Sequence, residues 1–139
     1  MEHRVQRVFL FLILTQAAHT VEEYATRLYA VFPPARFVSS LISDNVAVGF
    51  LIFNVTLVTF GLWCWAMPVR SGWRAGPGLI WFWTILALGN GIGHSAIAFS
   101  RRSYFPGVAT APLLLVLAAW LAILQARQRG RSSVASFIL

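Results

Sequence analysis

Apolar residues dominate four stretches of the chain, and each stretch is long enough to cross the hydrocarbon core of a bilayer. The stretches cover residues 7–29, 45–67, 78–100 and 107–126. A spanning helix needs about 20 apolar residues, because each residue advances the helix by about 1.5 Å. Prolines and glycines separate the stretches, and helices are expected to stop there. The pattern predicts an all-α fold in a single domain, an integral membrane bundle of four transmembrane helices.

Composition and charge agree with a membrane protein. The chain has 139 residues, of which 58% are hydrophobic and only 11% are charged, whereas about 25% of the residues in a soluble domain are charged. The net charge of +7 comes from arginine alone. The arginines lie in short clusters between the apolar stretches, which is typical of contacts with lipid headgroups rather than with nucleic acid. We therefore expect membrane lipid as a partner and no nucleic acid.

The arginine distribution also predicts the orientation of the spans. With four spans, both termini and the loop at 68–77 share one side of the membrane. That side holds seven arginines, and the opposite side holds Arg27, Arg36, Arg101 and Arg102. Short cytoplasmic loops carry the excess of positive charge. Both termini are therefore predicted to be cytoplasmic.

Ionisable residues interrupt the first and third stretches. Only four acidic residues occur in the chain, and Glu22 and Glu23 follow closely after His19 in the first stretch. Residues three and four apart share a helix face, so these three side chains are expected to project together, as are Asn90 and His94 in the third stretch. Ionisable groups at membrane depth are costly and mark candidate functional sites.

The two polar faces are expected to lie at the same depth. His19 lies about 18 Å along the helix from Arg7, and Asn90 and His94 lie about 20 and 25 Å from Pro77, at about 1.5 Å per residue. The first and third spans run in the same direction, so both faces fall in the outer half of the bilayer. This agreement predicts one joint site.

The residue types in this site suit a divalent metal ion. Two imidazoles with one or two carboxylates can bind Zn²⁺, or alternatively Fe or Mn, and leave a position open for water or substrate. A second carboxylate could then act as general base on a metal-bound water. No nucleotide or flavin motif is present. The metal ligands in this hypothesis are His19, Glu22 and His94, and the catalytic or orienting groups are Glu23, Asn90 and Tyr104.

Three short motifs carry a resemblance to a known family. The segment from His19 to Glu23 reads HTVEE, a second histidine follows at His94, and residues 104–107 read YFPG. In this order the motifs resemble the HXXEE family of small bacterial membrane proteins. The resemblance implies a bacterial inner-membrane location and supports the choice of site residues, but it supplies no reaction. It also implies that the turn at Pro106 and Gly107 belongs with the site.

A site at this depth would act on a lipid or another apolar small molecule. A metal-dependent hydrolase is the leading hypothesis, and a metal-free isomerase using glutamate as proton donor would need the same residues. A proton-coupled transporter would also place Glu and His at mid-depth, although four helices leave little room for a pathway unless the chain forms a homo-oligomer. In a structural membrane subunit the polar residues would only hold the helices together.

Overall fold

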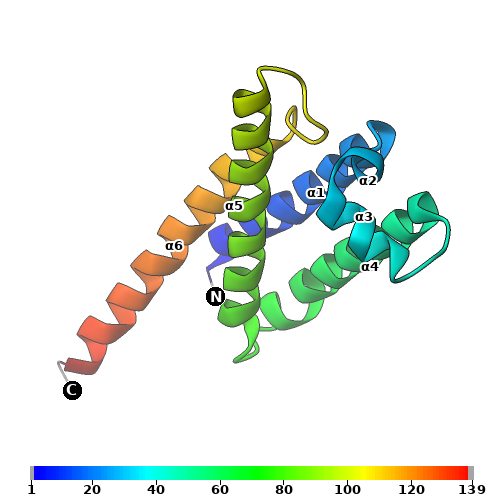
Figure 1. The fold of residues 1–139 in the computed structure, drawn as a ribbon. Coiled ribbons are helices and arrows are strands. Elements are labelled where there is room, and N and C mark those ends of the chain that lie inside the picture. The colour runs from blue at the N-terminus through cyan, green and yellow to red at the C-terminus, as the bar shows by residue number, and fades with distance from the viewer. Residues whose placement is uncertain (1, 138–139) are drawn as a thin grey trace.

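The chain folds into long helices joined by short turns, and the structure, a computed structural model, describes residues 2–137. Figure 1 shows α1, α5 and α6 crossing one another, with α4 and the short helices α2 and α3 to one side. No strand occurs within residues 2–137, so the predicted all-α class is confirmed for that range. The elements in chain order are α1 (His3–Ala25), α2 (Leu28–Val31), α3 (Pro33–Ser40), α4 (Val46–Cys64), the π-helical turn η1 (Trp65–Val69), α5 (Gly76–Arg101) and α6 (Ala111–Phe137).

Within residues 2–137, three helical segments are long and apolar enough to cross a membrane. They are Val46–Val69, Gly76–Arg101 and Ala111–Gln128. They correspond to the second, third and fourth predicted spans, although the last begins four residues later than 107. The chain therefore has helices of the length and composition found in membrane proteins, at three of the four predicted spans. That these helices cross a membrane stays a prediction.

Helix α1 differs from these three segments in composition. It is 23 residues long, but polar residues in its second half keep it outside the set of segments that are apolar enough to span. It also ends at Ala25 rather than at residue 29, because Arg27 adopts a left-handed backbone with a φ of 58°. The predicted end of the first span is therefore wrong.

A short helical cover follows α1. Pro33 and Pro34, which we expected to stop a helix, begin α3 instead, because proline is tolerated in the first helical turn. The segment between the first two predicted spans therefore contains a helix, α3, rather than only a turn. It lies directly on α4, where a Cβ on Gly49 would overlap the carbonyl oxygen of Ser39.

The buried positions of α1 recur every three or four residues. This spacing places them on one stripe of the helix, facing the other helices. The N-terminal half of the stripe packs in a core with Trp83 of α5 and with Leu114 and Leu121 of α6. The C-terminal half of the stripe continues on the same face with polar residues. The stripe consists of Val5, Phe9, Leu12, Gln16, His19 and Glu23.

Close helix contacts also occur at two other glycines. A Cβ on Gly61 of α4 would come within 3.0 Å of Ile13 and Trp83, and one on Gly91 of α5 would lie 3.1 Å from the Ala111 carbonyl oxygen. Small residues at such crossings let helices approach closely. Gly89 and Gly93, by contrast, face open space. Because they lie two residues from Gly91, they project to another side of α5.

Candidate metal centre

Three side chains from two helices bring potential ligand atoms together. Glu23 of α1 lies between His19 of the same helix and His94 of α5. Its Oε1 is 3.3 Å from Nε2 of His19 and 3.1 Å from Nε2 of His94. The three ligand atoms all lie within 4.8 Å of one another. All three residues are buried, with 0%, 6% and 7% of their surface exposed for His19, Glu23 and His94.

Hydrogen bonds determine which ring nitrogen of each histidine is available. Nδ1 of His94 lies 2.5 Å from the carbonyl oxygen of Pro106, which can only accept, so this nitrogen carries the proton. Nδ1 of His19 lies 2.7 Å from the Thr110 hydroxyl, which donates its own proton to Glu22 and therefore accepts from His19. In each neutral imidazole the lone pair is then on Nε2, and both lone pairs face Glu23.

This arrangement leaves a buried acceptor without a donor. Nε2 of His19 has no hydrogen-bond partner among the described residues, although Glu23 lies close to it. Two lone pairs directed at a carboxylate repel one another unless a cation or a proton lies between them. A tetrahedral ion with bonds of about 2.0–2.1 Å separates neighbouring ligands by about 3.3 Å. The two separations between Glu23 and the histidines are close to this value, and all three ligand atoms lie within 4.8 Å of one another. The residues therefore fit a divalent metal ion.

Glu22 has a different position and a different set of partners. Its carboxylate accepts four hydrogen bonds from the loop between α5 and α6. Oε1 accepts from the Tyr104 hydroxyl at 2.5 Å and from the Ala109 N–H at 2.9 Å, and Oε2 accepts from the Thr110 N–H at 2.9 Å and from its hydroxyl at 2.6 Å. These amides precede Ala111, where α6 begins, so Glu22 places negative charge at a helix N-terminus, which is stabilising.

The ligand group therefore differs from the one expected from the sequence. The structure groups Glu23, and not Glu22, with the two histidines, because Glu23 continues the buried stripe of α1 whereas Glu22 lies one position to its side. Tyr104 contacts Glu22 rather than the histidines. Burial, followed by the bond to the Glu22 carboxylate, raises the pKa of Tyr104, which keeps its hydroxyl protonated as a donor.

The loop at 104–107 closes over the histidines through its glycine. Gly107 has a φ of +89°, and a Cβ there would lie 2.7 Å from both Cε1 of His19 and Nδ1 of His94. Glycine is required for both reasons, since other residues disfavour this backbone and would collide with the rings. Phe105 is buried beside the His94 ring, with ring centroids 5.5 Å apart.

Asn90 lies next to the centre but does not contact it through any recorded hydrogen bond. Its Nδ2 donates to Oε1 of Gln16 at 3.4 Å. A second polar pair lies across α1 and α4, where the Thr20 hydroxyl donates to Oδ1 of Asn54 at 3.2 Å. Gln16 and Thr110 were missed in the sequence. The buried stripe of α1 could have indicated Gln16, and nothing short of the tertiary fold indicates Thr110.

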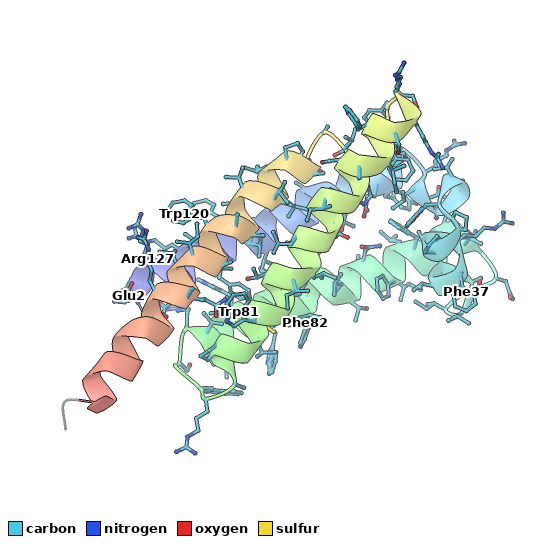
Figure 2. The ribbon with its side chains drawn as sticks, turned by 60° about the vertical axis from the view of Figure 1, so that its left-hand side comes forward. Glu2, Phe37, Trp81, Phe82, Trp120 and Arg127 are labelled. Carbon is cyan, nitrogen blue, oxygen red and sulfur yellow. The ribbon has the colours of Figure 1, made fainter. Side chains whose placement is uncertain are left out.

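A cavity of about 350 Å³ extends from the centre between α1, α4 and α5, and the short helices α2 and α3 also contribute to its wall. Glu23 and His94 form part of its wall, together with Gln16, Asn54 and Asn90. The rest of the lining is almost entirely apolar. Phe53 of α4 and Phe82 of α5 line it and are also exposed on the outside of the bundle. Figure 2 shows Phe82 at the lower part of α5, where its ring lies near that of Phe60 on α4.

Comparison with known proteins identifies the family. The model of the family described as "Protein of unknown function with HXXEE motif" matches residues 9–121. The chain belongs to the HXXEE family. Neither the curated proteins nor the solved structures provide a match.

The structure assigns separate positions to the residues of the HXXEE motif in this chain. The histidine, His19, and the second glutamate, Glu23, enter the buried group with His94. The first glutamate, Glu22, anchors the loop before α6. The matched region also includes the YFPG segment, whose glycine contacts both imidazoles. The recurring motifs of this HXXEE protein thus meet at one place.

Proposed function

We propose that this HXXEE protein is a metal-dependent membrane enzyme in which His19, Glu23 and His94 bind one divalent ion. The observation that carries the proposal is the direction of the two Nε2 lone pairs, which converge on Oε1 of Glu23 in a buried site. Two imidazoles and one carboxylate are a common ligand set for catalytic zinc, and Fe²⁺ or Mn²⁺ are the alternatives.

The surroundings of the histidines support a metal site. A metal-bound histidine commonly donates its other ring N–H to a carbonyl or a carboxylate, which orients the ring and raises its basicity. His94 donates to the Pro106 carbonyl oxygen, and His19 connects to Glu22 through the Thr110 hydroxyl. In both histidines, Nδ1 is thus hydrogen-bonded to the loop that precedes α6, and Nε2 is left for the metal.

Hydrolysis is the most economical reaction for such a site. A bound divalent ion supplies a water of lowered pKa and polarises a carbonyl or phosphoryl oxygen. Three protein ligands leave a position for that water or for substrate. Glu22 is saturated by four hydrogen bonds, so the second carboxylate oxygen of Glu23 is the nearest candidate for proton transfer. Asn90 and Gln16 lie on the cavity wall and could orient a polar group of the substrate.

The cavity supports an apolar substrate. Ligand pockets in proteins range from about 300 to 1,000 Å³, so a cavity of about 350 Å³ accepts a small molecule or a single hydrocarbon chain. Its apolar wall and its one polar end suit a molecule with a hydrocarbon body and one reacting polar group. A lipid fragment or an isoprenoid-sized compound has this character.

We further propose that α1 serves as the fourth membrane-spanning helix, with both termini cytoplasmic and the centre in the outer half of a bacterial inner membrane. Its buried stripe turns the polar residues toward α5 and α6, which removes them from lipid as the cost of ionisable groups requires. Its outward side includes Phe11 and Leu14, which are both exposed.

Metal content of the purified protein tests the proposal. Protein purified in detergent without chelator should contain about one divalent ion per chain by elemental analysis, since the site holds one set of three ligands. His19→Ala and His94→Ala should remove most of this metal while the protein remains helical by circular dichroism. His3→Ala is the matched control, because His3 is exposed and lies outside the group, and it should retain the metal.

The same variants separate catalysis from structural roles. If the polar residues only hold helices together, His94→Ala loses folded protein and wild type contains no metal. If the wild type folds without metal and gains no stability from added Zn²⁺, Fe²⁺ or Mn²⁺, the metal proposal is wrong. The His–Glu–His group would then share a proton, as the metal-free acid–base alternative requires.

A further inference from the structure

A second pocket lies outside the candidate metal centre, where the start of α1 meets η1. It has a volume of about 430 Å³ and is lined by His3, Gln6, Arg7, Trp65 and Arg70. The residues come from two segments that are about sixty positions apart in the sequence. None of them belongs to the candidate metal centre.

The π-helical turn shapes this pocket. Within η1 the Arg70 N–H donates to the Trp65 carbonyl oxygen at 3.0 Å, five residues back, and Pro68 lies inside the turn. The wider turn brings the guanidinium of Arg70 over the Trp65 ring, 5.2 Å from its centroid. Turns of this kind are often found at functional sites.

Two hydrogen bonds join the turn to α1. The indole N–H of Trp65 donates to the Gln6 carbonyl oxygen at 3.1 Å, and the Gln6 side chain donates to the Val69 carbonyl oxygen at 3.4 Å. These two bonds therefore fix η1 against the start of α1, where the pocket lies. Arg7, the next residue of α1, is positioned at its edge by the same contacts.

The pocket has positive charge that the protein does not neutralise. Neither Arg7 nor Arg70 forms an ion pair with a carboxylate in the part of the chain that the structure describes. Glu22, Glu23 and Asp44 lie in other parts of the chain. Glu2 caps the start of α1 beside His3 and has an interaction of its own, but neither it nor any other acidic side chain lines the pocket. Stacking on Trp65 occupies a face of the Arg70 guanidinium, whereas its N–H groups point along the plane, where a phosphate binds.

The position of the pocket indicates where such a phosphate would come from. The apolar segment Val46–Val69 ends one residue before Arg70, so the pocket lies at the level of the lipid headgroups. Basic pockets between transmembrane helices on the cytoplasmic side bind anionic headgroups. From this juxtaposition we propose that Arg7, Arg70 and Trp65 form a binding site for the phosphate of an anionic phospholipid in the cytoplasmic leaflet, an assignment of side that rests on the orientation proposed above.

The ligand class follows from the charge. The two guanidiniums carry two positive charges, so a headgroup with net negative charge is bound more favourably than a zwitterionic headgroup whose own ammonium neutralises its phosphate. Retention of phosphatidylglycerol or cardiolipin, compared with phosphatidylcholine, measures this preference. Native mass spectrometry of the protein released from mixed micelles reports the number and type of lipids that remain bound.

The test compares arginines that lie on the same side of the membrane. Wild type should retain one anionic phospholipid, and Arg7→Gln and Arg70→Gln should each lower its retention at least tenfold. Arg74→Gln is the matched control, because Arg74 is exposed four residues after Arg70 but does not line the pocket. It should retain the lipid, and all variants should keep their bound metal, which separates this site from the metal centre.

Three results would overturn the proposal. Equal lipid loss in Arg74→Gln and Arg70→Gln would show diffuse attraction between a basic face and anionic lipid. Equal retention of phosphatidylcholine would show that charge does not select the ligand. Displacement of the lipid by millimolar inorganic phosphate, with binding of that phosphate in its place, would assign the pocket to a free anion.

Discussion

Replacing Gly107 with alanine should disturb the metal centre more than any other single methyl group. The added Cβ would lie 2.7 Å from an atom of each imidazole, and the backbone has a φ of +89°. A left-handed backbone costs about 1–2 kcal/mol for a residue other than glycine, and an extra methyl in a packed interior costs about 1–3 kcal/mol. The free energy of unfolding should therefore fall by about 2–5 kcal/mol.

Gly72 provides the matched control. It also has a positive φ, +69°, but a Cβ there meets nothing within 4 Å. Gly72→Ala should therefore lose only the backbone part, about 1–2 kcal/mol. Restriction of the unfolded chain affects both variants alike and cancels in the comparison. The difference between them measures the collision with the histidines.

The assay is unfolding of each variant in mixed micelles, followed by circular dichroism, together with elemental analysis of the folded protein. Gly107→Ala should also weaken metal binding by about 10- to 100-fold, the usual effect of disturbing the groups that orient metal ligands. Gly72→Ala should leave the metal content unchanged. Equal losses of stability in the two variants, with full metal content in both, would refute the placement of Gly107 against the rings.

Three further predictions concern the other contacts of the site and its cover. Glu23→Gln should remove the metal and leave the fold intact. Glu22→Gln should instead lower the free energy of unfolding by about 2–4 kcal/mol, because two charged hydrogen bonds are weakened. If Glu22→Gln lost the metal and Glu23→Gln lost stability, Glu22 would be the ligand. The pKa of Tyr104 is raised in the folded protein, so its bond to Glu22 stabilises the fold below pH about 10 and is lost as pH rises through the raised value. Wild type should lose stability with alkaline pH more steeply than Tyr104→Phe, and parallel pH profiles would contradict the bond. Gly49→Ala should detach α3 from α4, because the added methyl group overlaps the Ser39 backbone. Faster proteolysis within residues 33–45 than in wild type would show this detachment.

Much of the site could be predicted from the sequence. Helical spacing alone places a glutamate beside His19 on the same face, and the depth argument correctly joined His19 to His94 on another helix. Both glutamates satisfy that spacing, since one is three and the other four residues from His19. Only the rotation of α1 in the bundle selects Glu23, and the recurrence of buried positions from Val5 onward is the one sequence signal of that rotation.

The sequence by itself determined the helical class, three helices that are long and apolar enough to cross a membrane, and the local motifs around His19, His94 and Gly107. These depend on spacing along one helix or on the hydropathy of one segment, which are local properties. The tertiary structure decided that Glu22 anchors the loop before α6, that Thr110 orients His19, and that Gly107 contacts both rings. Each of these contacts joins residues more than 80 positions apart in the sequence or depends on a close approach of backbone to side chain. Such contacts depend on how the helices cross, and hydropathy does not encode that geometry.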